Sequence, residues 1–226
     1  MQIIPCQTTT RTGKLVFGMT SAPVLNTPQP SITHVLYLHG FRSSPLSTKA
    51  RQVASLMASR FPHILWWCPQ LPPSPKAAAA LITEGTAHWP EQRMAVIGSS
   101  LGGFYATWLA AQRDCKAALL NPAIDPARDL AKYIGEQTAW HDPAERFDFA
   151  PEFVDELRAL EVGPLPHPER VWALIAKGDE VLDWREMTAR YPNSPQVVME
   201  GGDHAISNFA HYLPELLEFL DLQPAS

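Results

Sequence analysis

The chain has 226 residues, of which 46% are hydrophobic and 18% are charged, and its formal net charge is −5. Its length allows a substantial core, and its high hydrophobic content excludes intrinsic disorder as the main state. The acidic balance, with no run of Lys and Arg, argues against a nucleic-acid partner, and no apolar run reaches the roughly 18 residues that a membrane span requires.

Residues 1–31 are rich in Thr, Pro and small side chains, and we interpret them as an irregular N-terminal arm. From residue 32 onward, short apolar runs alternate with segments whose apolar residues recur at helical spacing. Strands are predicted at 32–40, 63–73, 93–99, 116–122, 170–179 and 195–202. Helices are predicted at 47–61, 75–89, 100–114, 126–134, 183–191 and 205–221.

This alternation is typical of an α/β fold, in which helices connect parallel strands and cover both faces of the sheet. We therefore predict one α/β domain over residues 32–222, with a mostly parallel sheet of about six strands. In open sheets of this kind, functional residues gather at the carboxyl ends of the strands. The residues that follow each strand are thus the candidates for a site.

An insertion at about 124–169 interrupts the alternation and is rich in aromatic residues and prolines. It is too long for a crossover with a single helix. An insertion at the carboxyl edge of a sheet would form a lid or a wall of a pocket. A packed excursion on the surface is an equally open interpretation.

The strongest chemical signal lies between the third strand and the helix that follows it. Gly98, Ser100 and Gly102 match G-x-S-x-G, the elbow that raises a nucleophilic serine above the sheet. The turn is sharp, so the residues two positions before and after the serine must be small. Ser99 fails this test because larger residues flank it. The pattern alone also fits a glycine-rich turn, but its place between a strand and a helix favours the elbow.

A serine hydroxyl is a weak nucleophile and needs a base and a group that orients the base. On this fold the partners follow the serine in the order acid, then histidine. Asp179 follows the fifth strand, in KGDEVLD, and His204 follows the sixth, in GGDHA. We predict a catalytic triad of Ser100, Asp179 and His204.

Two other carboxylates, Asp125 and Asp183, are rivals for the role of the acid, whereas Asp203, next to His204, points the wrong way to orient its ring. Asp125 follows the fourth strand, which can also supply the acid in this architecture. Asp183 lies one turn beyond Asp179 and is interpreted as a helix cap, and Asp203 is interpreted as a turn or cap residue.

The triad also needs an oxyanion hole. Its donors are predicted to be the N–H of Leu101, directly after the serine, and the N–H of Phe41, in the loop after the first strand. Gly40 allows the backbone to approach closely, and His39 is expected to brace the loop. Arg42 could meet an anionic substrate group, although a solvated surface arginine is the favoured interpretation.

The blocks LYLHGF, PQLPP, GSSLGGFYATWLA, NPA and GDEVLD resemble, in order and spacing, those of the YqiA-type esterases, the UPF0227 group of the α/β-hydrolase superfamily. The resemblance extends over about 32–222. It implies a compact α/β-hydrolase with Ser100, Asp179 and His204 as triad, acting on carboxylic esters or acyl thioesters through an acyl-enzyme. Arg42 departs from the family pattern, which has Asn there.

Other functions remain open on the same frame: an acyltransferase, a cofactor-free perhydrolase, or a non-catalytic protein that binds an acyl ligand. No metal or nucleotide motif is present, so we expect no cofactor, and the expected partner is a small acyl ester or thioester. The cysteines Cys6, Cys68 and Cys115 lie far apart, and the N-terminus has no signal-like apolar run, which predicts a reduced, cytoplasmic protein without a membrane partner.

Overall fold

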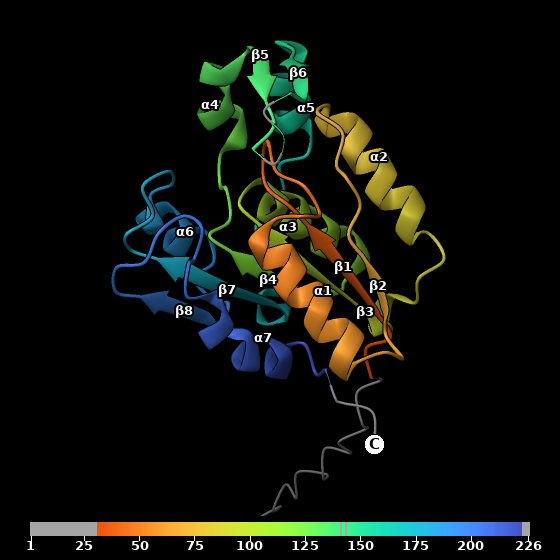
Figure 1. Cartoon of the computed structure of the whole chain (residues 1–226). Helices are drawn as coiled ribbons and strands as arrows, with labels where there is room; N and C mark the ends of the chain where they lie inside the picture. The colour runs from red at the N-terminus through yellow and green to blue at the C-terminus, as the bar shows by residue number, and fades with distance from the viewer. Residues whose placement is uncertain (1–30, 141, 143, 223–226) are drawn as a thin grey trace, which may run out of the picture.

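The computed structural model describes residues 31–222 except 141 and 143, so the predicted N-terminal arm lies almost wholly outside the described residues. Six parallel strands form one sheet in the order β2-β1-β3-β4-β7-β8 (Figure 1). Their bounds are β1 His34–Leu38, β2 Leu65–Trp67, β3 Met94–Ser99, β4 Lys116–Leu120, β7 Val171–Ala176 and β8 Gln196–Met199. The prediction of a parallel sheet of about six strands is confirmed.

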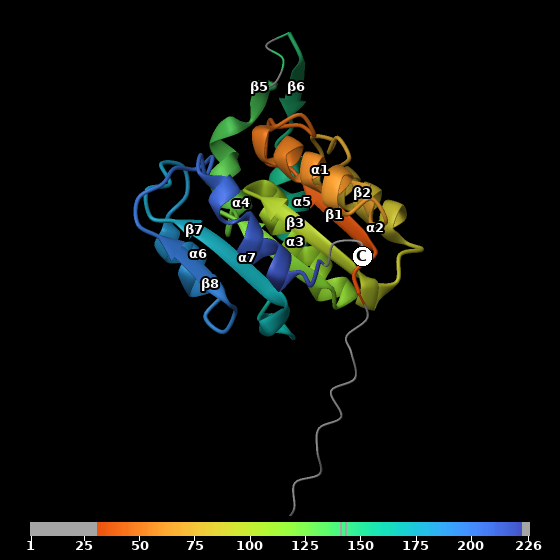
Figure 2. The ribbon, with the colours of Figure 1, turned by 60° about the horizontal axis from the view of Figure 1, so that its bottom comes forward.

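Helices cover both faces of the sheet. The helices α1 (Thr48–Arg60) and α7 (Leu213–Phe219) lie on the face turned toward the viewer in Figure 2, where Met57 and Leu216 share one core. The opposite face is covered by α2 (Pro75–Thr86), α3 (Leu101–Arg113) and α6 (Trp184–Arg190), and Phe104 and Met187 pack in a second core. Every residue of β3 and β7 is buried, as a strand covered on both faces requires.

The order of the strands creates the crevice in which the site lies. From β1 the chain adds β2 on one side, and it then returns to add β3, β4, β7 and β8 on the other side. The connections after β1 and β3 therefore leave in opposite directions at their carboxyl ends. Ligands bind at this switch point in open α/β sheets, and here it is bordered by the loop after Leu38 and by Ser100.

The insertion folds into elements of its own beyond the carboxyl ends of the strands (Figures 1 and 2). They are α4 (Pro126–Leu130), an antiparallel hairpin of β5 (Gly135–Thr138) and β6 (Arg146–Phe149), and α5 (Glu152–Ala159). The hairpin is not among the predicted elements. Phe149 is only 1% exposed, so the insertion is packed onto the domain as a wall beside the switch point.

The predicted helix at 205–221 is wrong in extent. The described chain forms a short 3₁₀ turn at Phe209–His211, and α7 begins only at Leu213. Pro214 stands in the first turn of α7, where its missing N–H costs nothing, but it could not continue a helix arriving from residue 205. Within the described residues, no helix combines the length and the apolar character that crossing a bilayer demands.

Candidate active site

Ser100 occupies the turn between β3 and α3 with φ of 56° and ψ of −120°. Such a conformation is uncommon for a residue with a Cβ and persists only where the surroundings impose it. Here the Ser100 N–H donates to the Leu120 carbonyl, and the Ser100 carbonyl accepts from the Ala123 N–H, both at 3.0 Å. The neighbouring β4 and its following loop thus hold the serine in its strained position.

The predicted small residues of the elbow are required by close backbone contacts. A Cβ on Gly102 would lie 2.0 Å from the Leu38 carbonyl oxygen, and a Cβ on Gly98 would lie 2.2 Å from the Gly102 carbonyl oxygen. On the oxyanion side, a Cβ on Gly40 would lie 3.1 Å from the Ser100 Cβ. The glycines therefore allow the elbow to pack directly against the end of β1.

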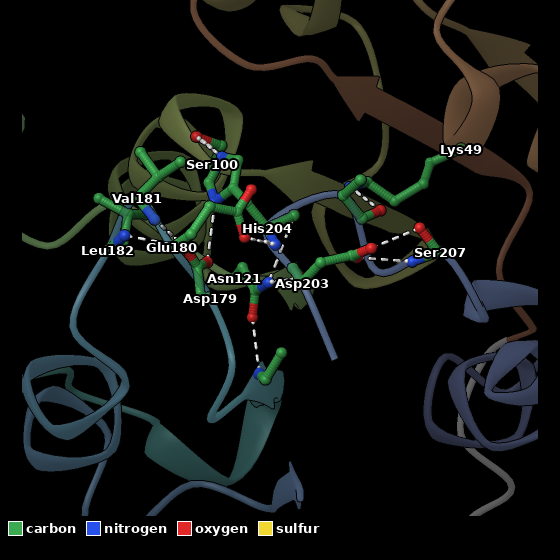
Figure 3. Close-up of polar contacts among 12 residues, drawn as sticks. Lys49, Ser100, Asn121, Asp179, Glu180, Val181, Leu182, Asp203, His204 and Ser207 are labelled. Carbon is green, nitrogen blue, oxygen red and sulfur yellow. Dashed lines mark hydrogen bonds and ion pairs between the residues drawn. The ribbon is translucent and has the colours of Figure 1, made fainter. Parts of the chain in front are cut away.

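The structure brings the three predicted triad residues into one hydrogen-bonded chain (Figure 3). His204 Nε2 lies 3.0 Å from Ser100 Oγ, and His204 Nδ1 lies 2.8 Å from Asp179 Oδ2. The other carboxylate oxygen of Asp179 accepts from the N–H groups of Val181 and Leu182, both at 2.8 Å. Oδ2 is thus directed at the imidazole and accepts its Nδ1–H, which leaves Nε2 free to accept the serine proton.

Burial strengthens this arrangement. The side chain of Asp179 has no exposed surface, whereas that of His204 is 23% exposed. Burying a carboxylate without partners would cost free energy, but the carboxylate of Asp179 accepts three hydrogen bonds. The imidazole can therefore become positively charged next to a fixed negative charge while its Ser100 side stays open to a substrate.

The loop that carries His204 is held by Asn121 and Glu180, two residues that are not among the predicted site residues. Asn121 is fully buried, and its Nδ2 donates to the carbonyls of Asp203 at 3.0 Å and His204 at 3.3 Å. Its Oδ1 accepts from the Ala176 N–H at 2.8 Å, and Glu180 Oε2 accepts from the His204 N–H at 2.9 Å. A polar residue directly after the buried strand β4, at the carboxyl edge, is the signal that could have identified Asn121.

Lys49 of α1 supports the same loop from the other side (Figure 3). Its Nζ donates to the Ala205 carbonyl at 2.6 Å. Burial lowers the pKa of Lys49 to about 8, against the opposing effect of the Asp203 and Asp179 carboxylates. Near neutral pH the folded protein therefore keeps a charged, partly buried ammonium group behind the histidine loop.

This shifted pKa predicts a pH-dependent stability. In the unfolded chain Lys49 has an ordinary pKa of about 10.4, so between about pH 8 and 10 the unfolded chain binds more protons than the folded one. The free energy of unfolding of the wild type, relative to Lys49→Met, should rise with pH across this window, by at most about 1.4 kcal/mol per pH unit. Urea unfolding at several pH values measures it, with the exposed Lys76→Met as control. A difference independent of pH would contradict the prediction.

The other three carboxylates accept hydrogen bonds from nearby backbone N–H groups, and two of them are helix caps. Asp203 accepts from the N–H and the hydroxyl of Ser207, and these hydrogen bonds lower its pKa. Asp183 caps α6, and Asp125 caps α4, each accepting a backbone N–H of its helix. Among the described residues, Asp179 is the carboxylate that is hydrogen-bonded to the His204 ring.

The predicted oxyanion loop is fixed at two places. His39 is 3% exposed, and its Nε2 accepts from the Leu71 N–H at 3.0 Å while its Nδ1 lies 3.0 Å from the Gly40 carbonyl oxygen. The ring of Phe41 packs against three aromatic rings of the insertion, with centroid distances of 5.3–5.9 Å: those of Tyr133, Phe147 and Phe149. The insertion thus positions the loop that faces Ser100.

A cavity of about 170 Å³ opens over the hydrogen-bonded chain. Ser100 and His204 lie in its wall together with the two predicted oxyanion residues, Phe41 and Leu101. Leu101 is the first residue of α3, so its N–H has no acceptor one turn earlier in the helix. Most of the remaining lining is apolar and comes from the loop after β4, the insertion and the loop after β7: Ala123, Pro126, Leu130, Tyr133, Trp140, Val181 and Leu182.

Residues 34–221 match the model of the uncharacterised protein family UPF0227. Similar solved structures include the alpha/beta hydrolase domain-containing protein 10 from mouse, which is 16% identical, with a TM-score of 0.64 over 83% of this chain and 90% of that one. Est1E from Butyrivibrio proteoclasticus with ferulic acid bound is 15% identical, with a TM-score of 0.61 over 88% and 91%. The esterase Pf2001 from Pyrococcus furiosus is 17% identical, with a TM-score of 0.53 over 85% and 82%. These likenesses establish the α/β-hydrolase fold.

Proposed function

The chain belongs to the UPF0227 family, and from the geometry of its site we propose that it is a serine hydrolase of carboxylic esters or acyl thioesters. The observation that carries the proposal is the chain of hydrogen bonds from Ser100 Oγ through His204 to Asp179, at 3.0 and 2.8 Å, beneath an apolar cavity. The same three roles recur in serine hydrolases of unrelated folds. Two of the similar structures are named as esterases or bind an aromatic acid, which agrees with this class.

In the acylation step, Ser100 Oγ attacks the acyl carbon while its proton passes to His204 Nε2. Asp179 keeps the imidazole in the correct tautomer and stabilises its positive form. The negative oxygen of the tetrahedral intermediate accepts hydrogen bonds from the N–H groups of Leu101 and Phe41. Each such donor contributes on the order of 3 kcal/mol to lowering the barrier.

The intermediate then collapses, and the bond to the leaving group breaks. The proton on His204 passes to the departing alcohol or thiol, and the acyl group stays on Ser100 as an ester. A water molecule enters, gives its proton to His204 Nε2 and attacks the same carbon. The second collapse releases the carboxylic acid and returns the proton to Ser100.

Covalent labelling tests this proposal. A fluorophosphonate probe should react with one serine of the folded chain, and peptide mass spectrometry should locate the label on Ser100. Labelling should also abolish hydrolysis of 4-nitrophenyl esters in proportion to its extent, and heat-denatured protein should not react. A folded chain that takes no label and turns over neither esters nor thioesters would reject the proposal and would favour a protein that only binds acyl ligands.

A further inference from the structure

Arg42, directly after the oxyanion residue Phe41, has a backbone conformation that few arginines adopt. Its φ is 59°, in the left-handed region that Gly and Asn tolerate far better. The Arg42 carbonyl accepts from the Trp140 N–H at 2.7 Å. The hairpin thus holds the backbone of Arg42 in a strained state, and strain of this kind is concentrated at functional sites.

The side chain of Arg42 is held as well, and it is not a freely solvated surface group. Its Nε donates to the Thr138 carbonyl at 2.6 Å, and its guanidinium carbon lies 4.3 Å from the centroid of the Trp140 ring. Stacking on an aromatic face fixes the plane of the guanidinium group. Within the described residues, the two terminal nitrogens of Arg42 have no hydrogen-bond acceptor.

This guanidinium borders the cavity that contains the candidate nucleophile. Arg42 and Lys132 line the cavity together with Ser100. The acidic residue in the lining of this cavity is Asp129, which accepts a hydrogen bond from Arg128 Nε at 2.8 Å. The adjacent Arg128 cation therefore already offsets the charge of Asp129. The hairpin side of the cavity therefore presents a fixed positive group whose donors remain available.

We propose that Arg42 binds an anionic group of the substrate, so that the preferred substrates are esters or thioesters bearing a carboxylate or phosphate close to the scissile bond. A guanidinium fork with two unpaired terminal nitrogens suits bidentate binding of such a group. The inference rests on the proposed hydrolase function. It makes Arg42 a specificity residue that contacts the substrate but takes no part in bond cleavage.

The wild-type chain provides the first test. Mono-4-nitrophenyl glutarate and 4-nitrophenyl hexanoate have acyl groups of similar length, and only the first ends in a carboxylate. The acetate esters of 4-hydroxybenzoate and of 4-methylphenol form a second pair. Only the first of these two bears a carboxylate, and it lies on the leaving group. The KM of at least one charged ester should be about 10-fold or more below that of its neutral partner. The pair that shows the preference identifies the side of the substrate that Arg42 binds.

Arg42→Gln should raise the KM of the preferred charged ester, relative to the KM of its neutral partner, by about 10- to 100-fold, and should change the ratio of the two kcat values by less than about 2-fold. Arg42→Lys should restore part of the loss, since it keeps the charge without the fork. Arg146→Gln on the same hairpin, whose arginine pairs with Glu136 away from the cavity, is the matched control and should change neither ester.

Two results would overturn this inference. One is a wild type with equal KM values within both ester pairs, and the other is an Arg42→Gln variant that affects charged and neutral esters alike. Failure to hydrolyse any of the four esters, combined with no fluorophosphonate labelling and no thioester turnover, would instead contradict the proposed function. Turnover of the neutral esters without a charge preference would leave that function standing and reject only the role of Arg42.

Discussion

Replacing Ser100 with Ala is expected to lower kcat/KM for 4-nitrophenyl esters by at least about 10⁴-fold while the fold is retained. The hydroxyl is the group that His204 Nε2 contacts at 3.0 Å, so its removal takes away the oxygen that would attack the acyl carbon. Alanine keeps the Cβ, so the contacts of the elbow with Gly40 remain. Steady-state turnover and thermal unfolding of the purified variant measure both halves of the prediction.

Two companion variants sharpen this test. Ser99→Ala removes the neighbouring hydroxyl at the end of β3 and should keep nearly full turnover. Ser100→Gly should be inactive but more stable than the wild type by roughly 1 kcal/mol or more, because glycine adopts φ of 56° without strain. If Ser100→Ala kept substantial turnover, or if only Ser99→Ala lost turnover, the assignment of Ser100 as the nucleophile would be wrong.

Those features of the site that depend on local sequence could be predicted from it. Buried strands are read from continuous apolar runs, and the elbow from the spacing of Gly98 and Gly102 about the serine. His204 follows from its place after the last strand. The hydrogen-bond partners of Asp179 could not be predicted in this way, because the N–H groups of Val181 and Leu182 meet its carboxylate only once the loop after β7 has folded.

The parts that could not be predicted depend on tertiary contacts. Strand β5 has the sequence GEQT, which carries no apolar alternation, and its hairpin is stabilised by aromatic packing with Phe41 from a distant loop. Asn121 supports the His204 loop across 83 residues of sequence. The orientation of Arg42 likewise requires Thr138 and Trp140, which no local pattern places beside it.

Asp179→Asn is expected to lower kcat by about 10⁴-fold with little change in the fold. Two N–H groups, those of Val181 and Leu182, point at Oδ1, so the single amide oxygen of Asn must take that place. Its NH₂ group then replaces Oδ2 and donates to His204 Nδ1. This forces the imidazole into the tautomer with Nε2–H, which can donate to Ser100 Oγ but cannot accept its proton.

The matched control is Asp183→Asn, which changes the same atoms only four residues away. Asp183 caps α6 by accepting the Arg185 N–H at 2.9 Å, and Asn caps a helix about as well as Asp. Its turnover should therefore stay close to that of the wild type. If Asp179→Asn retained more than about a tenth of wild-type kcat, the carboxylate would not be setting the tautomer of His204. The contact at 2.8 Å would then be structural, and another group would have to orient the base.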